Sequence, residues 1–239
     1  MNISFDFSSR VALVVGGSKG IGQRVCIDLL NSGAKVFYVS RNRSQDLDSL
    51  GAKHLKCDLR NELAIKSCFD KLPSLDFLVN CAAINHCKKI EKISSQEWDD
   101  VLAVNLRAYF ITCKEAVEKM KKANFGRIVN VSSIAGRHRS LVSGTHYVAS
   151  KSAIIGLTRQ LAYECAGDNI TVNVVCPSQT MTPMLKESMT SEQIEQLCTA
   201  IPLKRIAETQ DQSLPILFLC SDGANYITGA AIDINGGQY

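Results

Sequence analysis

The sequence has no apolar run near the ~20 residues that a membrane-spanning helix needs. Its first ten residues, MNISFDFSSR, contain no apolar core of a signal peptide. The net charge is only +4 and the basic residues are scattered along the chain, which does not favour binding to nucleic acid. We therefore expect a cytoplasmic protein that binds neither a membrane nor nucleic acid.

The ten cysteines include no C-x-x-C pair, the spacing typical of zinc sites and redox pairs. Most of them stand singly in apolar segments, namely Cys26, Cys57, Cys68, Cys113, Cys165, Cys176 and Cys220. Such cysteines behave as small hydrophobic side chains. We expect reduced, mostly buried thiols and no metal site.

Seven short apolar runs alternate with segments of helical periodicity over the whole chain. We predict strands at 11–15, 35–39, 53–57, 75–80, 127–132, 170–176 and 229–234. Helices are predicted at 21–30, 45–50, 61–72, 95–122, 146–166 and 209–221, the last with a kink or a late start at Pro215. A loop is expected at 133–145 and weakly helical or irregular structure at 180–202. This alternation predicts one α/β domain, residues 1–239, with a parallel sheet between two helical layers.

Three glycines, Gly16, Gly20 and Gly22, follow the first predicted strand and open the first predicted helix. A strand, a glycine turn and a helix begin a dinucleotide-binding unit, in which the helix N-terminus binds a pyrophosphate. The spacing is G-x-x-x-G-x-G, however, and not the common G-x-G-x-x-G. Taken alone, this turn is equally compatible with a purely structural connection.

Four polar residues, Asn105, Ser133, Tyr147 and Lys151, fall where the catalytic groups of such a sheet are expected. Tyr147 and Lys151 are four residues apart and share one helix face, where an ammonium group would lower the pKa of the phenol. Such a tyrosine can donate a proton to a carbonyl oxygen, and Ser133 can hydrogen-bond the same oxygen. The alternative is a tyrosine–lysine surface pair, because Y-x-x-x-K is common by chance.

The order of several further motifs decides between these alternatives. They are GGSKGIG (16–22), CDL (57–59), VNCAA (79–83), VNL (104–106), IVNVSS (128–133), YVASK (147–151), NVVCPS (173–178), YITG (226–229) and INGG (234–237). Over essentially its whole length the chain resembles the short-chain dehydrogenase/reductase family. The resemblance implies a Rossmann-like, doubly wound fold and carbonyl/alcohol chemistry with a nicotinamide cofactor.

By position, the resemblance implies that Tyr147 is the general acid/base and that Ser133 orients the carbonyl group. Lys151 would also bind the nicotinamide ribose, and Asn105 would hold a water that links Lys151 to solvent. Asp58 resembles the carboxylate that contacts the adenine, and Asn80 and Ala82 resemble the wall of the adenosine pocket. The full set implied for the cofactor is Gly16, Ser18, Lys19, Gly20, Ile21, Gly22, Ser40, Arg41, Asp58, Leu59, Asn80, Ala82, Tyr147, Lys151, Pro177, Thr180 and Thr182.

Three positions depart from the family pattern, and none of them is catalytic. Ala83 and Ser178 stand where glycine is usual, and Asn235 replaces the common aspartate near the C-terminus. Ala83 would tighten the turn beside the cofactor, and Ser178 leaves the path of the following loop open.

The end of the second predicted strand lacks the acidic residue that usually binds a free ribose 2′-hydroxyl. Ser40 and Arg41 stand there instead, and Lys19 lies in the glycine turn, so hydroxyl and cationic groups suited to a 2′-phosphate are present. We therefore expect NADP(H), and with it ketone reduction. In the alternative, Arg41 and Arg43 are solvated residues of a turn.

The substrate is less well defined by the sequence. The resemblance is to 3-oxoacyl-acyl-carrier-protein reductases, and Met181, Met184 and Met189 in a predicted lid suit an acyl chain. The alternative is a small carbonyl or xylulose reductase, because Asp168 weakens attraction to an acidic carrier protein. The run 137–139 (Arg-His-Arg) could hold an anionic or hydroxyl-rich molecule. A non-catalytic NADP(H)-binding protein is the competing class, and the family resemblance implies a homotetramer.

Overall fold

The computed structural model describes residues 4–140 and 142–238. Its centre is a seven-stranded parallel sheet in the order β3-β2-β1-β4-β5-β6-β7. The strands are β1 (Val11–Val15), β2 (Lys35–Ser40), β3 (Lys53–Lys56), β4 (Phe77–Asn80), β5 (Gly126–Val131), β6 (Ile170–Pro177) and β7 (Ala231–Ile234). The predicted parallel α/β sheet is therefore confirmed, strand by strand.

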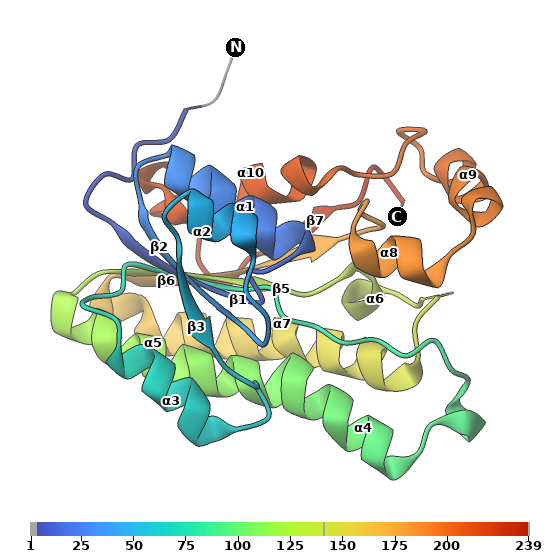
Figure 1. The fold of residues 1–239 in the computed structure, drawn as a ribbon, viewed down its shortest axis with the longest axis horizontal. Coiled ribbons are helices and arrows are strands. Elements are labelled where there is room, and N and C mark those ends of the chain that lie inside the picture. Colours follow the sequence, from blue (N-terminus) through green and yellow to red (C-terminus); the bar gives the residue numbers. More distant parts are fainter. Residues whose placement is uncertain (1–3, 141, 239) are drawn as a thin grey trace.

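Helices cover both faces of the sheet, with α1, α2 and α10 on one side and α3, α4, α5 and α7 on the other (Figure 1). Their bounds are α1 (Gly20–Asn31), α2 (Gln45–Ser49), α3 (Glu62–Asp70), α4 (Ser95–Leu102), α5 (Ala108–Ala123), α6 (Ile134–Arg137), α7 (Thr145–Cys165), α8 (Pro183–Ser188), α9 (Ser191–Ala200) and α10 (Thr209–Cys220). None of these helices is both long and apolar enough to cross a membrane.

Strand β1 shows why the apolar runs form strands between two helical layers. All five of its residues are buried. Leu13 and Val15 belong to the core beneath α3 and α5, whereas Ala12 and Val14 belong to the core beneath α1 and α10. Alternating side chains point to opposite faces of a strand, so a continuous apolar run is needed where both faces are covered.

The predicted helix 95–122 is interrupted by one π-helical turn, Ala103–Arg107, between α4 and α5. The capping box of Ser94 and Glu97 at its start is present. Asn105 lies in the π turn, and its side chain is bound to the loop that follows β4. Such turns are frequent at functional sites, and no periodicity in the sequence indicates them.

Three other predictions of local structure are made more exact by the structure. The loop predicted at 133–145 contains the short helix α6, which Ser133 caps by accepting a hydrogen bond from the Ala135 N–H. The segment 180–202, expected to be irregular or weakly helical, forms α8 and α9, each with a threonine N-cap. Helix α10 starts at Thr209 and continues through Pro215, so it has no late start.

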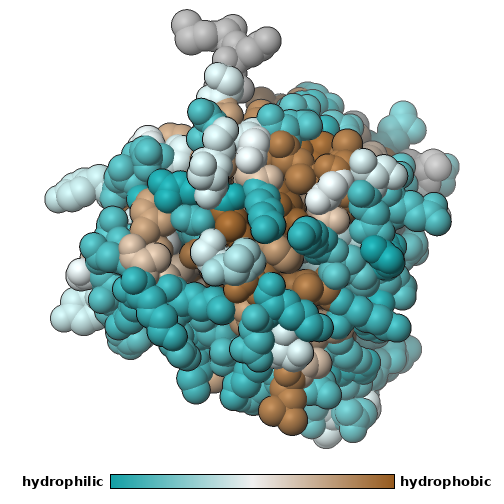
Figure 2. Space-filling model, turned by 60° about the vertical axis from the view of Figure 1, so that its left-hand side comes forward, coloured by the Kyte–Doolittle hydropathy of each residue, from teal (hydrophilic) through white to brown (hydrophobic). Residues whose placement is uncertain are grey.

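Seven of the cysteines are buried, and they are the seven expected to be so. The surface is mostly hydrophilic on the face that Figure 2 turns forward, where apolar side chains gather in a few patches. Large exposed apolar side chains include Phe110 on α5 and Tyr163 on α7, which are 53% and 84% exposed. No group of three or more histidine, cysteine or acidic side chains suited to a metal ion occurs among the described residues.

Candidate active site

A cavity of about 360 Å³ lies where the parallel strands end, lined by the loops that follow β1 to β6. It brings together the predicted catalytic residues Ser133, Tyr147 and Lys151. All of the predicted cofactor residues except Asn80 also line it: Gly16, Ser18, Lys19, Gly20, Ile21, Gly22, Ser40, Arg41, Asp58, Leu59, Ala82, Pro177, Thr180 and Thr182, with Tyr147 and Lys151 again.

In the turn after β1, the positions of Gly16 and Gly22 leave no room for a side chain. A Cβ atom on Gly16, whose φ is +83°, would lie 2.6 Å from the backbone of Ala82. A Cβ atom on Gly22 would lie 2.3 Å from the Gly16 carbonyl oxygen. Helix α1 then begins without a side-chain cap and without an acidic residue in its first turn. Its N-terminal N–H groups therefore suit a phosphate group.

Tyr147 and Lys151 lie on the first two turns of α7 and line the cavity, where Lys151 is fully buried and Tyr147 half-buried. The Lys151 Nζ lies 5.7 Å from the centre of the Tyr147 ring and donates a hydrogen bond to the Val131 carbonyl oxygen at 2.7 Å. Burial lowers the pKa of Lys151 to about 8. The Ser133 side chain lies beside Tyr147 and lowers the pKa of its phenol, so the two groups expected to act on one carbonyl oxygen are neighbours.

The expected direction of the pKa shift at Tyr147 is not the one found. Burial raises the pKa of this phenol, and the hydrogen bond from Ser133 lowers it by less. The expectation considered only the charge of Lys151, whereas desolvation penalises the phenolate itself. In the ligand-free protein Tyr147 is therefore a protonated phenol, the form that a general acid requires.

The backbone around Lys151 is fixed by close contacts from the loop that follows β5. The Ser132 hydroxyl donates to the Lys151 carbonyl oxygen at 2.6 Å. A Cβ atom on Gly136 would lie 2.7 Å from the same carbonyl group. On the other side, the Tyr109 hydroxyl bridges the carbonyl oxygens of Ala82 and Val131, at 3.0 and 3.2 Å.

Asn105 does not line the cavity. Its buried side chain accepts a hydrogen bond from the Ile84 N–H at 2.8 Å and donates to the Ile84 carbonyl oxygen at 2.9 Å and to the Ser150 hydroxyl at 3.2 Å. With these partners, the side chain ties the loop after β4 to α7. The expected role of Asn105 in holding a water near Lys151 stays a prediction.

Asn80 does not line the cavity either, and its expected contribution to the adenosine pocket stays a prediction. Its fully buried amide donates to Asn130 Oδ1 at 2.9 Å and accepts from the Thr112 hydroxyl at 2.9 Å. These bonds link β4 to β5 and α5 beneath the site. Polar groups at this depth are retained when they are fully hydrogen-bonded.

The loop that follows β2 presents one cation that no ion pair engages. Arg43 pairs with Asp48 at 2.9 Å, whereas Arg41 and Lys19 have no such partner among the described residues. The Ser40 hydroxyl donates to the Asn42 carbonyl oxygen at 2.7 Å and lies 3.0 Å from His54 Nε2. Its hydrogen is thus already engaged, so Lys19 and Arg41 are the groups ready to meet an anion.

Asp58 is engaged by a neighbour that the sequence analysis missed. Arg60 donates to both of its carboxylate oxygens, at 3.0 and 2.6 Å, and lowers the pKa of Asp58 to about 2. Arg60 itself lines the cavity, as does Cys81, whose pKa burial raises to about 12. One signal in the sequence indicates Arg60 and Cys81, namely that each stands next to a predicted site residue.

The three departures from the family pattern are accommodated without distortion of the site. Ala83 and Ser178 line the cavity, and the Ser178 N–H donates to the Ile234 carbonyl oxygen at 3.1 Å. Asn235 accepts a hydrogen bond from the Gly237 N–H at 2.9 Å. None of these contacts involves Tyr147 or Lys151.

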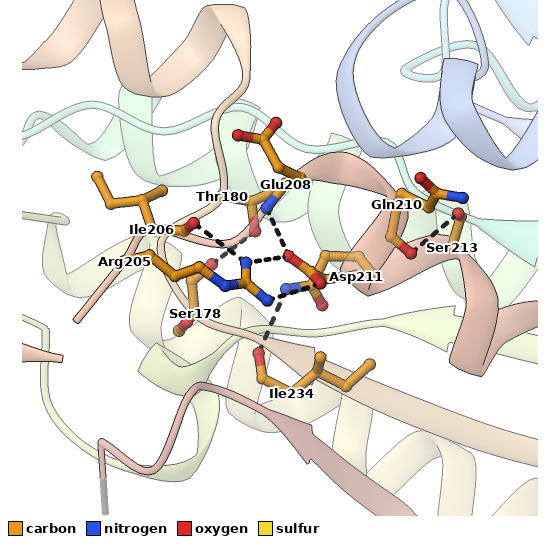
Figure 3. A network of polar contacts seen from close by, with 10 residues as sticks. Ser178, Thr180, Arg205, Ile206, Glu208, Gln210, Asp211, Ser213 and Ile234 are labelled. Carbon is orange, nitrogen blue, oxygen red and sulfur yellow. Dashed lines mark hydrogen bonds and ion pairs between the residues drawn. The ribbon is translucent and has the colours of Figure 1, made fainter. Parts of the chain in front are cut away.

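The lid is the segment 181–202, which carries α8 and α9. A network of polar contacts holds the chain between this lid and α10 (Figure 3). Arg205 donates to both carboxylate oxygens of Asp211, at 2.5 and 2.9 Å, and Asp211 accepts from the Glu208 N–H at 2.7 Å. The Thr180 hydroxyl donates to the Ser178 carbonyl oxygen at 3.0 Å in the loop after β6. This network fixes the ends of the segment that carries α8 and α9.

The lid contributes less apolar surface to the cavity than its methionines suggested. Met184 lines the cavity, but Met181 and Met189 pack into a separate cluster around Leu185. The run 137–139 does not line it either, and Arg137 pairs with Asp233 at 3.1 Å.

The chain is similar to known proteins over almost its whole length. Residues 15–238 match the family model described as enoyl-(acyl carrier protein) reductase. The chain thus belongs to the short-chain dehydrogenase/reductase family of oxidoreductases. It is 34% identical to the 3-oxoacyl-[acyl-carrier-protein] reductase of Staphylococcus aureus (strain Mu50), over 97% of this chain and 98% of that protein.

Two further relatives extend the comparison. The acetoacetyl-CoA reductase of Rhizobium meliloti (strain 1021) is 35% identical over 97% of this chain and 99% of that protein. A crystal structure of a 3-oxoacyl-[acyl-carrier protein] reductase from Brucella melitensis contains bound NAD. It superimposes with a TM-score of 0.91 at 30% identity, and the match covers 98% of this chain and 92% of that one.

Proposed function

We propose that this chain is an NADP(H)-dependent ketone reductase in which Tyr147 is the general acid. The observation that carries the proposal is the protonated phenol of Tyr147, placed beside Ser133 and Lys151 in a cavity that also contains the glycine turn. Perturbed titratable groups inside such a cleft are typical of catalytic sites.

The residues present suit a nicotinamide dinucleotide. The close approach of Gly16 to Ala82, the uncapped N-terminus of α1 and the hydroxyl group of Thr182 provide backbone and donor contacts. A reduced nicotinamide held there would supply a hydride to the substrate carbon. Lys19 and Arg41 line the cavity and form no ion pair with a described residue, which supports NADP(H) over NAD(H).

The side chains then act together on the substrate oxygen. Ser133 and Tyr147 hydrogen-bond the carbonyl oxygen, and Tyr147 transfers its proton to this oxygen as negative charge develops on it. The Lys151 ammonium stabilises the phenolate that remains after the transfer. Its lowered pKa of about 8 keeps it charged at neutral pH.

For the substrate we propose a 3-oxoacyl thioester, on an acyl-carrier protein or on coenzyme A, as the names of the relatives suggest. Lys121, which could attract an acidic carrier, pairs with Asp168 at 3.0 Å, and Lys122 pairs with Glu118 at 3.4 Å. The second candidate is a small carbonyl or xylulose-type substrate. It is favoured by the polar side chains of Ser140, Ser143 and Gln179 in the cavity wall.

The test is the consumption of NADPH, followed by absorbance, with an acetoacetyl thioester, a small dicarbonyl and a ketose. Turnover of the thioester at the highest kcat/KM supports the first candidate, and reduction of a dicarbonyl or ketose alone supports the second. If NADPH binds but no ketone is reduced, the chain is a cofactor-binding protein and the proposal is wrong.

A further inference from the structure

Asn85 lies at the point where the loops that follow β4 and β5 meet. It lines the cavity, and its Nδ2 group faces the Val142 carbonyl oxygen and the Ser143 hydroxyl, both at 3.4 Å. The second of these loops begins at Ser133 and ends at α7, which carries Tyr147. Asn85 is therefore part of the wall on the substrate side of the cavity.

The orientation of the Asn85 amide follows from these neighbours. A carbonyl oxygen such as that of Val142 only accepts hydrogen bonds, so the amide nitrogen must face it. The Asn85 Oδ1 atom then points elsewhere, is shielded from solvent, and receives no hydrogen bond from any described residue. A buried acceptor without a donor is costly. Among the described residues, two of the buried side-chain atoms without a partner, Asn85 Oδ1 and Gln179 Oε1, belong to residues that line the cavity, where a ligand can supply the donor.

The surrounding wall indicates what kind of ligand group this is. Ser140 and Ser143 also line the cavity, and they bring hydroxyl groups to the same loop. The residues that line it from the described parts of 131–147 and 177–185 include no charged side chain. The charged lining residues apart from Lys151 are Lys19, Arg41, Asp58 and Arg60, which follow β1, β2 and β3. The substrate side is therefore polar but neutral.

We propose that Asn85 Oδ1 accepts a hydrogen bond from a neutral O–H or N–H group of the substrate, and so makes Asn85 a specificity-determining residue. This assignment rests on the proposed ketone reductase function and deepens it. Two sources share the chemistry: a hydroxyl group beside the carbonyl of a small ketone, and an amide N–H in the arm of an acyl thioester.

The first arm of the test compares hydroxyacetone with butanone, which differ by a hydroxyl group in place of a methyl group. The ratio of their kcat/KM values is measured for the parent and for Asn85→Leu, so that the difference in carbonyl reactivity cancels. If a hydroxyl is the donor, the ratio falls about tenfold in Asn85→Leu. Asn85→Asp, which retains an acceptor oxygen, should keep a ratio nearer to that of the parent.

The second arm compares acetoacetyl-N-acetylcysteamine with the S-butyl thioester of acetoacetate, which lacks the amide N–H. A fall of about tenfold in this ratio alone identifies the arm of a thioester as the source. A purely structural role of Asn85 would lower all four values of kcat/KM together and leave both ratios unchanged, which overturns the assignment. If the parent binds NADPH but reduces none of the four compounds, the proposed function itself fails.

Discussion

Replacing Lys151 with methionine is expected to stabilise the ligand-free protein while it abolishes turnover. The Lys151 side chain is 1% exposed, and no carboxylate forms an ion pair with it among the described residues. Its ammonium group donates a hydrogen bond to the Val131 carbonyl oxygen. The Tyr109 hydroxyl lies 3.2 Å from that oxygen and 3.0 Å from the Ala82 carbonyl oxygen, so in Lys151→Met its one hydrogen can still serve Val131.

The size of the effect follows from the pKa of Lys151, which burial lowers from 10.5 to about 8. A shift of this size corresponds to about 3 kcal/mol, at 1.36 kcal/mol per pH unit, and below pH 8 it opposes folding. Methionine keeps the apolar stem without the charge. The free energy of unfolding should therefore rise by about 3 kcal/mol at pH 7, and the Tm by roughly 6 °C or more.

The pH dependence distinguishes this cause from simple repacking. Between about pH 8 and the unfolded pKa near 10.5, the unfolded parent binds more protons than the folded parent, so its stability rises with pH. The advantage of Lys151→Met should be complete below pH 8 and shrink as the pH approaches 10.5. Urea unfolding without cofactor at pH 7, 8, 9 and 10 measures it. A variant less stable than the parent at pH 7, or an advantage that does not change with pH, would refute the reasoning.

The remaining predictions concern the site and the surface. Tyr147→Phe should bind cofactor and fold but lose a factor of roughly 10² to 10⁴ in turnover, and retention of more than about a tenth of the activity would identify another acid. The parent should favour NADPH over NADH at least tenfold in kcat/KM, about 1.4 kcal/mol. Arg41→Ala should raise the KM for NADPH far more than for NADH, whereas the matched control Arg43→Ala, whose arginine is already paired with Asp48, should change neither. With Phe110 and Tyr163 exposed, sedimentation at micromolar concentration should show a homotetramer, and a monomer would contradict this prediction.

The sequence correctly predicted elements such as the buried strands, whose hydrophobic pattern follows from their place between two helical layers. Val11–Val15 is apolar throughout because both faces of β1 are covered, and the structure confirms this strand without a change of bounds. The π turn at Ala103–Arg107 could not be predicted, because its Asn105 is bound to Ile84, a residue distant in sequence. A tertiary hydrogen bond of this kind leaves no local periodicity.

Burial also explains which properties of the site residues could not be predicted from the sequence. Spacing correctly placed Tyr147 and Lys151 on one helix face, but the pKa shifts of both groups are set mainly by desolvation. Asn80 fits the motif of its family, yet its side chain lies beneath the sheet edge in a network with Thr112 and Asn130. Motifs identify which residues matter, whereas the direction of each side chain depends on the packing around it.

Two locally unfavourable features meet at this cavity. Lys151 is a buried cation without an ion-pair partner in the described chain, and Asn85 has an amide oxygen without a donor. Both cost stability in the ligand-free protein. The phenolate that develops on Tyr147 would offset the first, and a donor group of the substrate would offset the second. At the same edge of the sheet, the positive φ of Gly16, which glycine adopts without strain, lets the backbone approach Ala82 closely. A site built for a cofactor and a polar ketone requires these features at one place.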